Sequence, residues 1–174
     1  MSKPFDVNET MRALEKSVRA VSQELAKRVG GSLVLSTPYG RPDLWINPPP
    51  KNYRPGLARG NWRAAIGRVP SDTELPTRDV GGARTIANIE AVVTFWDGKQ
   101  PLNISNAANH IVPLDNGTAS RQVSRGFVAR AVADGVASLD NTTLEVPYCP
   151  ARAPRPTFVA RFGRASKRIG TPRG

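Results

Sequence analysis

The sequence is poor in the side chains that carry most enzyme and metal chemistry. Its 174 residues include a single cysteine, Cys149, and a single histidine, His110. An intramolecular disulfide needs two cysteines and a Cys/His zinc site needs several such ligands, so both are excluded. A Ser-His-Asp or Cys-His group would have to use His110, which has no clustered carboxylate, cysteine or second histidine near it in the sequence. We therefore expect no metal, no cofactor and no enzymatic activity.

Long apolar stretches are also missing. No stretch approaches the roughly 20 residues that span a bilayer, and residues 1–4 do not begin a signal peptide. The glycine pairs at 30–31 and 81–82 lack the following residues of a phosphate-binding loop, so they do not predict a nucleotide site. These features predict a protein that is made and used in the cytosol, or in an assembly built there, without a membrane partner.

Positive charge is abundant but concentrated at one end. Of the formal net charge of +11, seven charges lie in residues 151–174, which contain no Asp or Glu. A block of one charge sign stays extended unless a polyanion or an acidic surface binds it. We expect a basic, Pro/Arg-rich extension over residues 148–174 that contacts an acidic partner protein or, without sequence specificity, nucleic acid. Its expected contact residues are Arg152, Arg155, Arg161, Arg164, Lys167, Arg168 and Arg173.

Residues 7–29 show the clearest periodicity. Seven apolar side chains recur at spacings of three or four and so share one face of an α-helix: Val7, Met11, Leu14, Val18, Val21, Leu25 and Val29. Asp6 followed by Glu9 is typical of a helix start, and the glycine pair at 30–31 predicts the stop. Such a helix either lies across a small sheet or, because the spacing is heptad-like, forms a seam between subunits.

Short periodic segments alternate with long irregular ones in the rest of residues 1–147. Strands are predicted at 60–67, 102–106 and 144–146, helices at 83–96 and 127–139, a helical turn at 111–114, and a strand or helix exit at 32–36. In the 127–139 helix the side chains expected to face inward are Phe127, Val128, Ala131, Val132, Val136 and Leu139.

Two long loops separate these elements. The first loop, residues 37–60, combines six prolines with aromatic and basic residues and is a candidate docking arm, and the second loop covers residues 70–82. We predict one α+β domain over residues 1–147. It contains a mostly antiparallel sheet of about four strands, packed by the long N-terminal helix and two shorter helices, and it continues into the extended basic tail.

Two stretches resemble the tail-completion or head–tail joining family of tailed-bacteriophage neck proteins. Residues 56–63 are similar to the family's Thr-Gly-x-x-Arg-Gly-Asn-Trp stretch, through Arg59, Gly60, Asn61 and Trp62. Residues 103–128 follow the family's order of a strand ending in Asn, a short turn, Leu-Glu-x-Gly-x-Ser, and Gln-Ala-Pro-x-Gly before a helix, although Asp replaces Glu and Val-Ser-Arg replaces Ala-Pro-x. The residues that carry this second match are Asn106, Leu114, Asp115, Gly117, Ser120, Gln122 and Gly126.

The resemblance implies a structural virion protein in the phage neck, assembled in the host cytoplasm. Members of this family are small α+β subunits that form a ring, commonly of six copies, which completes the tail and joins it to the head-side connector or stopper. Expected partners are further copies of the chain, the stopper or connector, the tail terminator or tail tube, and genomic DNA in the ring lumen. Two alternatives stay open: a tail terminator ring that caps the tail tube, and a non-specific nucleic-acid-binding protein, since the pI is about 10.8.

Overall fold

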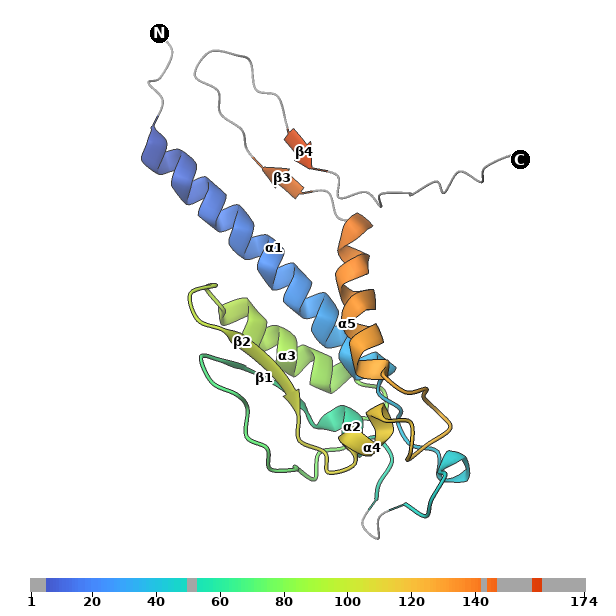
Figure 1. Cartoon of the computed structure of the whole chain (residues 1–174). Helices are drawn as coiled ribbons and strands as arrows, with labels where there is room; N and C mark the ends of the chain where they lie inside the picture. The colour runs from blue at the N-terminus through green and yellow to red at the C-terminus, as the bar shows by residue number, and fades with distance from the viewer. Residues whose placement is uncertain (1–5, 50–52, 142–143, 147–157, 161–174) are drawn as a thin grey trace, which may run out of the picture.

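A computed structural model describes residues 6–49, 53–141, 144–146 and 158–160 of the chain. The helices are α1 (Val7–Ser36), α2 (Leu57–Gly60), α3 (Ala83–Phe95), α4 (Ile111–Asp115) and α5 (Phe127–Ala137), with 3-10 turns η1 (Pro42–Leu44) and η2 (Ser138–Asn141). The strands are β1 (Trp62–Ile66), β2 (Leu102–Asn106), β3 (Leu144–Val146) and β4 (Phe158–Ala160). This is the expected mixture of a long N-terminal helix, shorter helices and antiparallel strands (Figure 1).

Helix α1 is longer than the sequence predicts. It begins as expected, because the Asp6 side chain accepts hydrogen bonds from the backbone N–H groups of Asn8 and Glu9. The predicted stop at Gly30 is wrong: the helix continues to Ser36 and is thirty residues long. The 32–36 segment is therefore the last turn of this helix, and it contains the helix's most buried apolar residues.

The strands form two separate pairs among the described residues. β1 and β2 pair antiparallel from Trp62 opposite Asn106 to Ile66 opposite Leu102. β3 and β4 form a second antiparallel pair. The prediction of one sheet of about four strands is wrong for this part of the chain, because no strand of one pair is hydrogen-bonded to a strand of the other. A two-stranded sheet is only marginally stable alone and relies on packing against helices.

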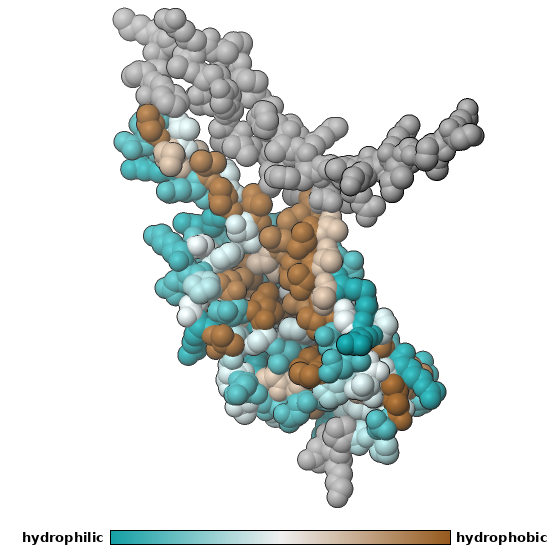
Figure 2. Space-filling view, viewed as in Figure 1, coloured by the Kyte–Doolittle hydropathy of each residue, from teal (hydrophilic) through white to brown (hydrophobic). Residues whose placement is uncertain are grey.

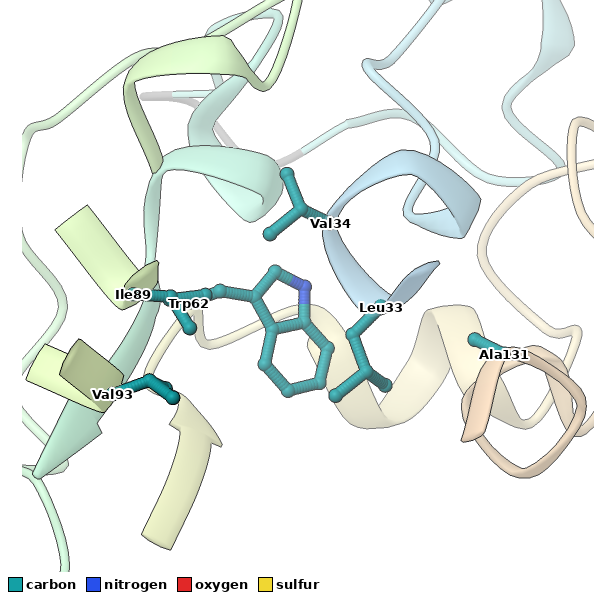
Figure 3. Close-up of a cluster of buried hydrophobic side chains, with 6 residues drawn as sticks. All are labelled: Leu33, Val34, Trp62, Ile89, Val93 and Ala131. Atoms are coloured by element: carbon teal, nitrogen blue, oxygen red, sulfur yellow. The ribbon is translucent and has the colours of Figure 1, made fainter. Parts of the chain in front are cut away.

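The main hydrophobic core lies where the end of α1, helix α3 and strand β1 meet. Figure 3 shows the Trp62 indole between side chains of α1 and α3. The buried members of this cluster are Leu33, Val34, Trp62, Ile89, Val93 and Ala131. A second cluster joins α2, α4 and the start of α5 through Ala58, Ala108, Leu114, Ala119 and Phe127. α1 thus packs on α3 and α5 rather than directly across the sheet.

Helix α5 is oriented differently from the prediction. Phe127, Ala131 and Gly135 form its buried face. Ala131 and Gly135 lie against α1, and Phe127 belongs to the second cluster. Val132 and Val136, which the sequence analysis places inward, are 39% and 47% exposed. Gly135 explains the difference, because its lack of a side chain lets α5 approach α1 most closely at this residue. The two valines then lie beside the contact and not within it.

Candidate assembly surface and loop anchors

Arg59, the first residue of the phage-like pattern, connects the end of α1 to the second loop. Its guanidinium donates to the carbonyl oxygens of Leu35 at 3.0 Å, Thr37 at 2.5 Å and Val80 at 2.5 Å. Burial lowers the pKa of Arg59, but these carbonyls satisfy its donors. This side chain stabilises the fold of its own subunit.

Gly60 and Asn61 hold the second loop against the body. The fully buried Asn61 amide donates to the carbonyls of Leu57 at 2.8 Å and Leu75 at 2.9 Å, and its oxygen accepts from the Leu75 N–H at 2.8 Å. At Gly60 a Cβ atom would lie 2.4 Å from the Thr77 carbonyl oxygen, so a side chain there would displace the loop.

Trp62 links the core to the end of α1. Its indole N–H donates to the Thr37 hydroxyl at 2.7 Å, and that hydroxyl donates to the Leu33 carbonyl at 2.7 Å. Thr37 is fully buried, so this relay satisfies polar atoms that water cannot reach.

Asn106 joins the end of β2 to α2. Its amide donates to the Ala58 carbonyl at 2.8 Å, and its oxygen accepts from the Ala108 N–H at 2.9 Å. The asparagine that ends this strand therefore shapes the turn that follows it and fixes a neighbouring helix.

Ser120 and Gln122 anchor the first loop. Ser120 forms an antiparallel bridge with Trp45, and the Gln122 side-chain oxygen accepts from the N–H groups of Gly40 at 3.2 Å and Arg41 at 3.3 Å. The described residues of the first loop therefore include two helical turns and these anchored positions. The docking role of this loop stays a prediction.

The remaining pattern residues shape the entry to α5. Leu114 is buried, and the Gly117 N–H donates to its carbonyl at 3.0 Å. The Asp115 carboxylate accepts from the Val128 N–H at 2.9 Å, and the Asp115 carbonyl accepts from the N–H of Gly126, the N-cap of α5, at 2.6 Å. A carboxylate at this helix start satisfies a free N–H and offsets the helix dipole.

His110 lies in an aromatic cluster that brings both loops to the body. Its ring centroid is 5.4 Å from that of Tyr53, which lies 4.5 Å from Trp45 in an edge-on contact. The Glu74 carboxylate is 4.0 Å from the His110 Nδ1 and accepts from the Asn109 N–H at 2.8 Å. Burial lowers the pKa of His110, while Glu74 acts in the opposite direction. The histidine is therefore neutral at pH 7.

Asp79 fixes the end of the second loop to the start of α3. Burial alone would raise the pKa of Asp79, but hydrogen bonds from the Thr85 N–H and hydroxyl and from the Gly82 N–H lower it below its usual value. The N-cap residue of α3, Gly82, has no side chain that could cap the helix. The Asp79 carboxylate takes this role instead.

The N-terminal half of α1 exposes apolar side chains along one face. Val7, Met11, Leu14 and Val18 are 60%, 50%, 45% and 57% exposed, although they continue the stripe that is covered further along the helix. In Figure 2 a band of hydrophobic residues follows α1 from its N-terminal end towards α5. We call these four residues the projecting stripe.

Several predicted features lie outside the described residues or find no counterpart within them. The basic residues of the tail, from Arg152 to Arg173, fall in ranges that the structure does not describe. In residues 6–49, 53–141, 144–146 and 158–160, no three His, Cys, Asp or Glu side chains are placed to hold a metal ion. No helix in this part of the chain is both long and apolar enough to cross a membrane.

Comparison of the chain with protein-family models, with curated proteins and with solved structures finds no match.

Two features of the structure were not predicted from the sequence. The His110 cluster was not foreseen, because its members come from separate segments with no common spacing. The division of the α1 stripe into a covered and an exposed half was also missed, because both halves have the same periodicity. The length of the predicted helix could have indicated the exposed half, because the short elements of one small domain cannot cover an apolar stripe of this length.

Proposed function

We propose that this chain is a structural subunit of a tailed-phage neck, in which copies form a ring that completes the tail and joins it to the head-side connector or stopper. The ring number of six and the neighbouring proteins come from the family resemblance. The observation that carries the proposal is the projecting stripe, an apolar helix face that stays exposed while the other end of the same helix lies in the main core.

The projecting stripe is suited to assembly. Contiguous apolar surface on a soluble subunit marks a site of protein–protein contact, because burying it releases water. The residues of the phage-like pattern also support a structural role. Arg59, Asn61, Asn106 and Gln122 use their polar atoms to hold loops within the subunit, which suits a rigid building block.

The state of the purified full-length chain tests the proposal in solution. Light scattering is expected to give a mass several times the 18.8 kDa of one chain, and electron microscopy is expected to show closed rings. A monomer over the micromolar range would overturn the ring assignment.

The particle phenotype tests the place of the ring in the virion. A lysate lacking this chain is expected to contain filled heads and finished tails that are not joined. Tails of irregular length would instead favour the tail terminator, and joined infectious particles would overturn the neck assignment. Nucleic-acid affinity that falls steeply with salt, in a chain that never oligomerises, would favour the nucleic-acid-binding alternative.

A further inference from the structure

We infer that the open edge of strand β2 in one copy pairs with strand β4 of the next copy, so that the two strand pairs form one four-stranded sheet across the boundary between subunits. This inference rests on the proposed ring and adds a contact that is separate from the projecting stripe. The two edges belong to different parts of the subunit, so the contact is head-to-tail. Contacts of this kind generate rings when the rotation between copies closes.

The hydrogen bonds that flank the β1–β2 ladder fix which residues bond across it. The Gly67 N–H donates to the Pro101 carbonyl at 2.8 Å, just beyond one end of the ladder. The Ala107 N–H donates to the Asn61 carbonyl at 3.4 Å, just beyond the other end. In an antiparallel pair, hydrogen-bonded and non-hydrogen-bonded residue pairs alternate along the strands. The odd-numbered residues of β2 are therefore the ones bonded to β1.

The even-numbered residues of β2 carry the free main-chain groups. The N–H and carbonyl groups of Asn103 and Ser105 point towards β1, so those of Leu102 and Ile104 point away from it. Within the described part of the chain, β1 is the only strand that pairs with β2, and the main chain of Leu102 and Ile104 makes no hydrogen bond. A row of unpaired N–H and carbonyl groups is a template for a further strand.

The sequence of β2 does not protect this edge. Residues 102–106 read Leu-Asn-Ile-Ser-Asn and contain no proline and no charged side chain. Strands that stay unpaired at a sheet edge are commonly protected by proline or by charge, especially lysine. A two-stranded sheet also gains stability when a third strand joins it. The β2 edge therefore has the properties of a strand that becomes covered.

Strand β4 supplies a matching edge. It pairs with β3 along one side, and β3 also contacts α1, so the other side of β4 is the outward edge of this pair. Its residues Phe158, Val159 and Ala160 are uncharged, and phenylalanine and valine favour strands. Main-chain hydrogen bonds supply the affinity of an added strand, so the contact does not need a wide apolar surface.

The two strand pairs lie apart within one subunit. Figure 1 shows β3 and β4 on one side of α1, and β1 and β2 on the other. The β2 edge that β4 meets therefore belongs to another copy. Two β2 edges could also pair with each other, but that contact is symmetric and closes a dimer, whereas the proposed ring needs a head-to-tail contact. Because β3 contacts the helix that carries the projecting stripe, one neighbouring copy can contact both the stripe and β4.

Hydrogen exchange of single backbone amides tests the pairing in the full-length chain. In the ring, the amides of Leu102 and Ile104 are expected to exchange at least about tenfold more slowly than in a dilute, monomeric sample, because strand pairing protects them. The amides of Asn103 and Ser105, which bond β1, are expected to be protected in both samples. A ring with fast exchange at Leu102 and Ile104 would overturn the inference and leave the proposed ring intact. A monomer at every concentration would overturn both.

Val159→Pro and Val159→Ala identify the partner strand. Proline removes a main-chain N–H from β4, whereas alanine keeps it. The proline variant is expected to lose the slow exchange at Leu102 and Ile104, and the alanine variant to keep it. Residue 159 lies outside both hydrophobic clusters, so the melting temperature of the dilute chain is expected to stay within about 2 °C in both variants. Slow exchange in the proline variant would show that a different segment covers β2 and would overturn the inference.

Cysteine crosslinking tests which edges meet. In a Cys149→Ser background, Ser105→Cys and Val159→Cys are made as single variants, and a short bismaleimide is added to each variant and to a mixture combined before assembly. The mixture is expected to give a crosslinked dimer, and each variant alone is expected to stay monomeric on a denaturing gel. Efficient self-crosslinking of Ser105→Cys would show symmetric pairing of two β2 edges and overturn the inference, as would a mixed ring that gives no crosslink.

Discussion

The two halves of α1 carry one apolar stripe but have opposite surroundings. Around Val34 the helix is enclosed by α3 and the Trp62 indole, whereas around Val18 it is open to solvent. Figure 1 shows the same contrast, with α1 extending away from the part of the molecule where the other helices and β1 gather. Hydrophobic periodicity thus reports which face of a helix is apolar, while the rest of the chain decides whether that face is covered within the subunit.

Val34→Asp should have the largest effect, because it tests the covered half. Val34 is fully buried, and an unpaired carboxylate there would cost about 4 kcal/mol or more in the free energy of unfolding. Chemical denaturation followed by tryptophan fluorescence measures this loss. The matched Val18→Asp variant is expected to unfold at nearly the wild-type denaturant concentration. Equal destabilisation by both variants would remove the contrast between the halves.

Asn61→Ala should have the next largest effect, because it releases the second loop from the body. The substitution removes three hydrogen bonds of a buried side chain and leaves the Leu75 N–H without its partner, at a cost of about 2–3 kcal/mol. Proteolysis within residues 70–82 should accelerate in parallel. Asn103→Ala is the control, since it removes a single solvent-exposed hydrogen bond to Arg68 and should cost under about 0.5 kcal/mol.

His110 should make the body, but not the projecting half, sensitive to acid. Its pKa is lowered in the folded chain, first by burial, so the unfolded chain binds the proton more readily. Stability is then complete above the unfolded pKa of about 6.5 and falls as the pH drops below it, by at most about 1.4 kcal/mol per pH unit. Denaturation at pH 7.5 and pH 5.5 measures the difference. His110→Gln should remove it, and an unchanged difference in that variant would contradict this role.

Val18→Ser should have the smallest effect on folding. The side chain is 57% exposed, so its loss should change the free energy of unfolding by less than about 0.5 kcal/mol. The same substitution at Val93, which is fully buried in α3, should cost several times more. Thermal unfolding of both variants at a concentration where assembly is absent makes the comparison, and a large loss at Val18 would mean that the stripe packs within the subunit.

Sequence reasoning was accurate where the signal was local. Helices α3 and α5, the Asp6 cap and strands β1 and β2 lie where the local pattern placed them. It failed where the deciding contact is distant. The sequence analysis takes Gly30 as a helix stop, but Gly30 lies inside α1 against Ile89. The helix ends before its C-cap Thr37, whose hydroxyl donates a hydrogen bond to the Leu33 carbonyl and accepts one from the Trp62 indole.

The anchoring roles of the pattern residues were equally invisible in the sequence. Arg59, Asn61 and Gln122 bind main-chain atoms of distant segments, and a backbone N–H or carbonyl leaves no residue-type signal at its position. In the structure the polar atoms of these three side chains hold loops in place. The ring, its neighbours and the DNA contact stay predictions.

The most direct test of the account is the mass of the Val18→Asp chain in solution, measured by light scattering beside the wild type at equal concentration. The account predicts a multi-subunit wild type and a monomeric variant, while the two chains share one melting temperature at a concentration where assembly is absent. A Val18→Asp chain that assembles as fully as the wild type would contradict the claim that the projecting half of α1 exists to bind another copy.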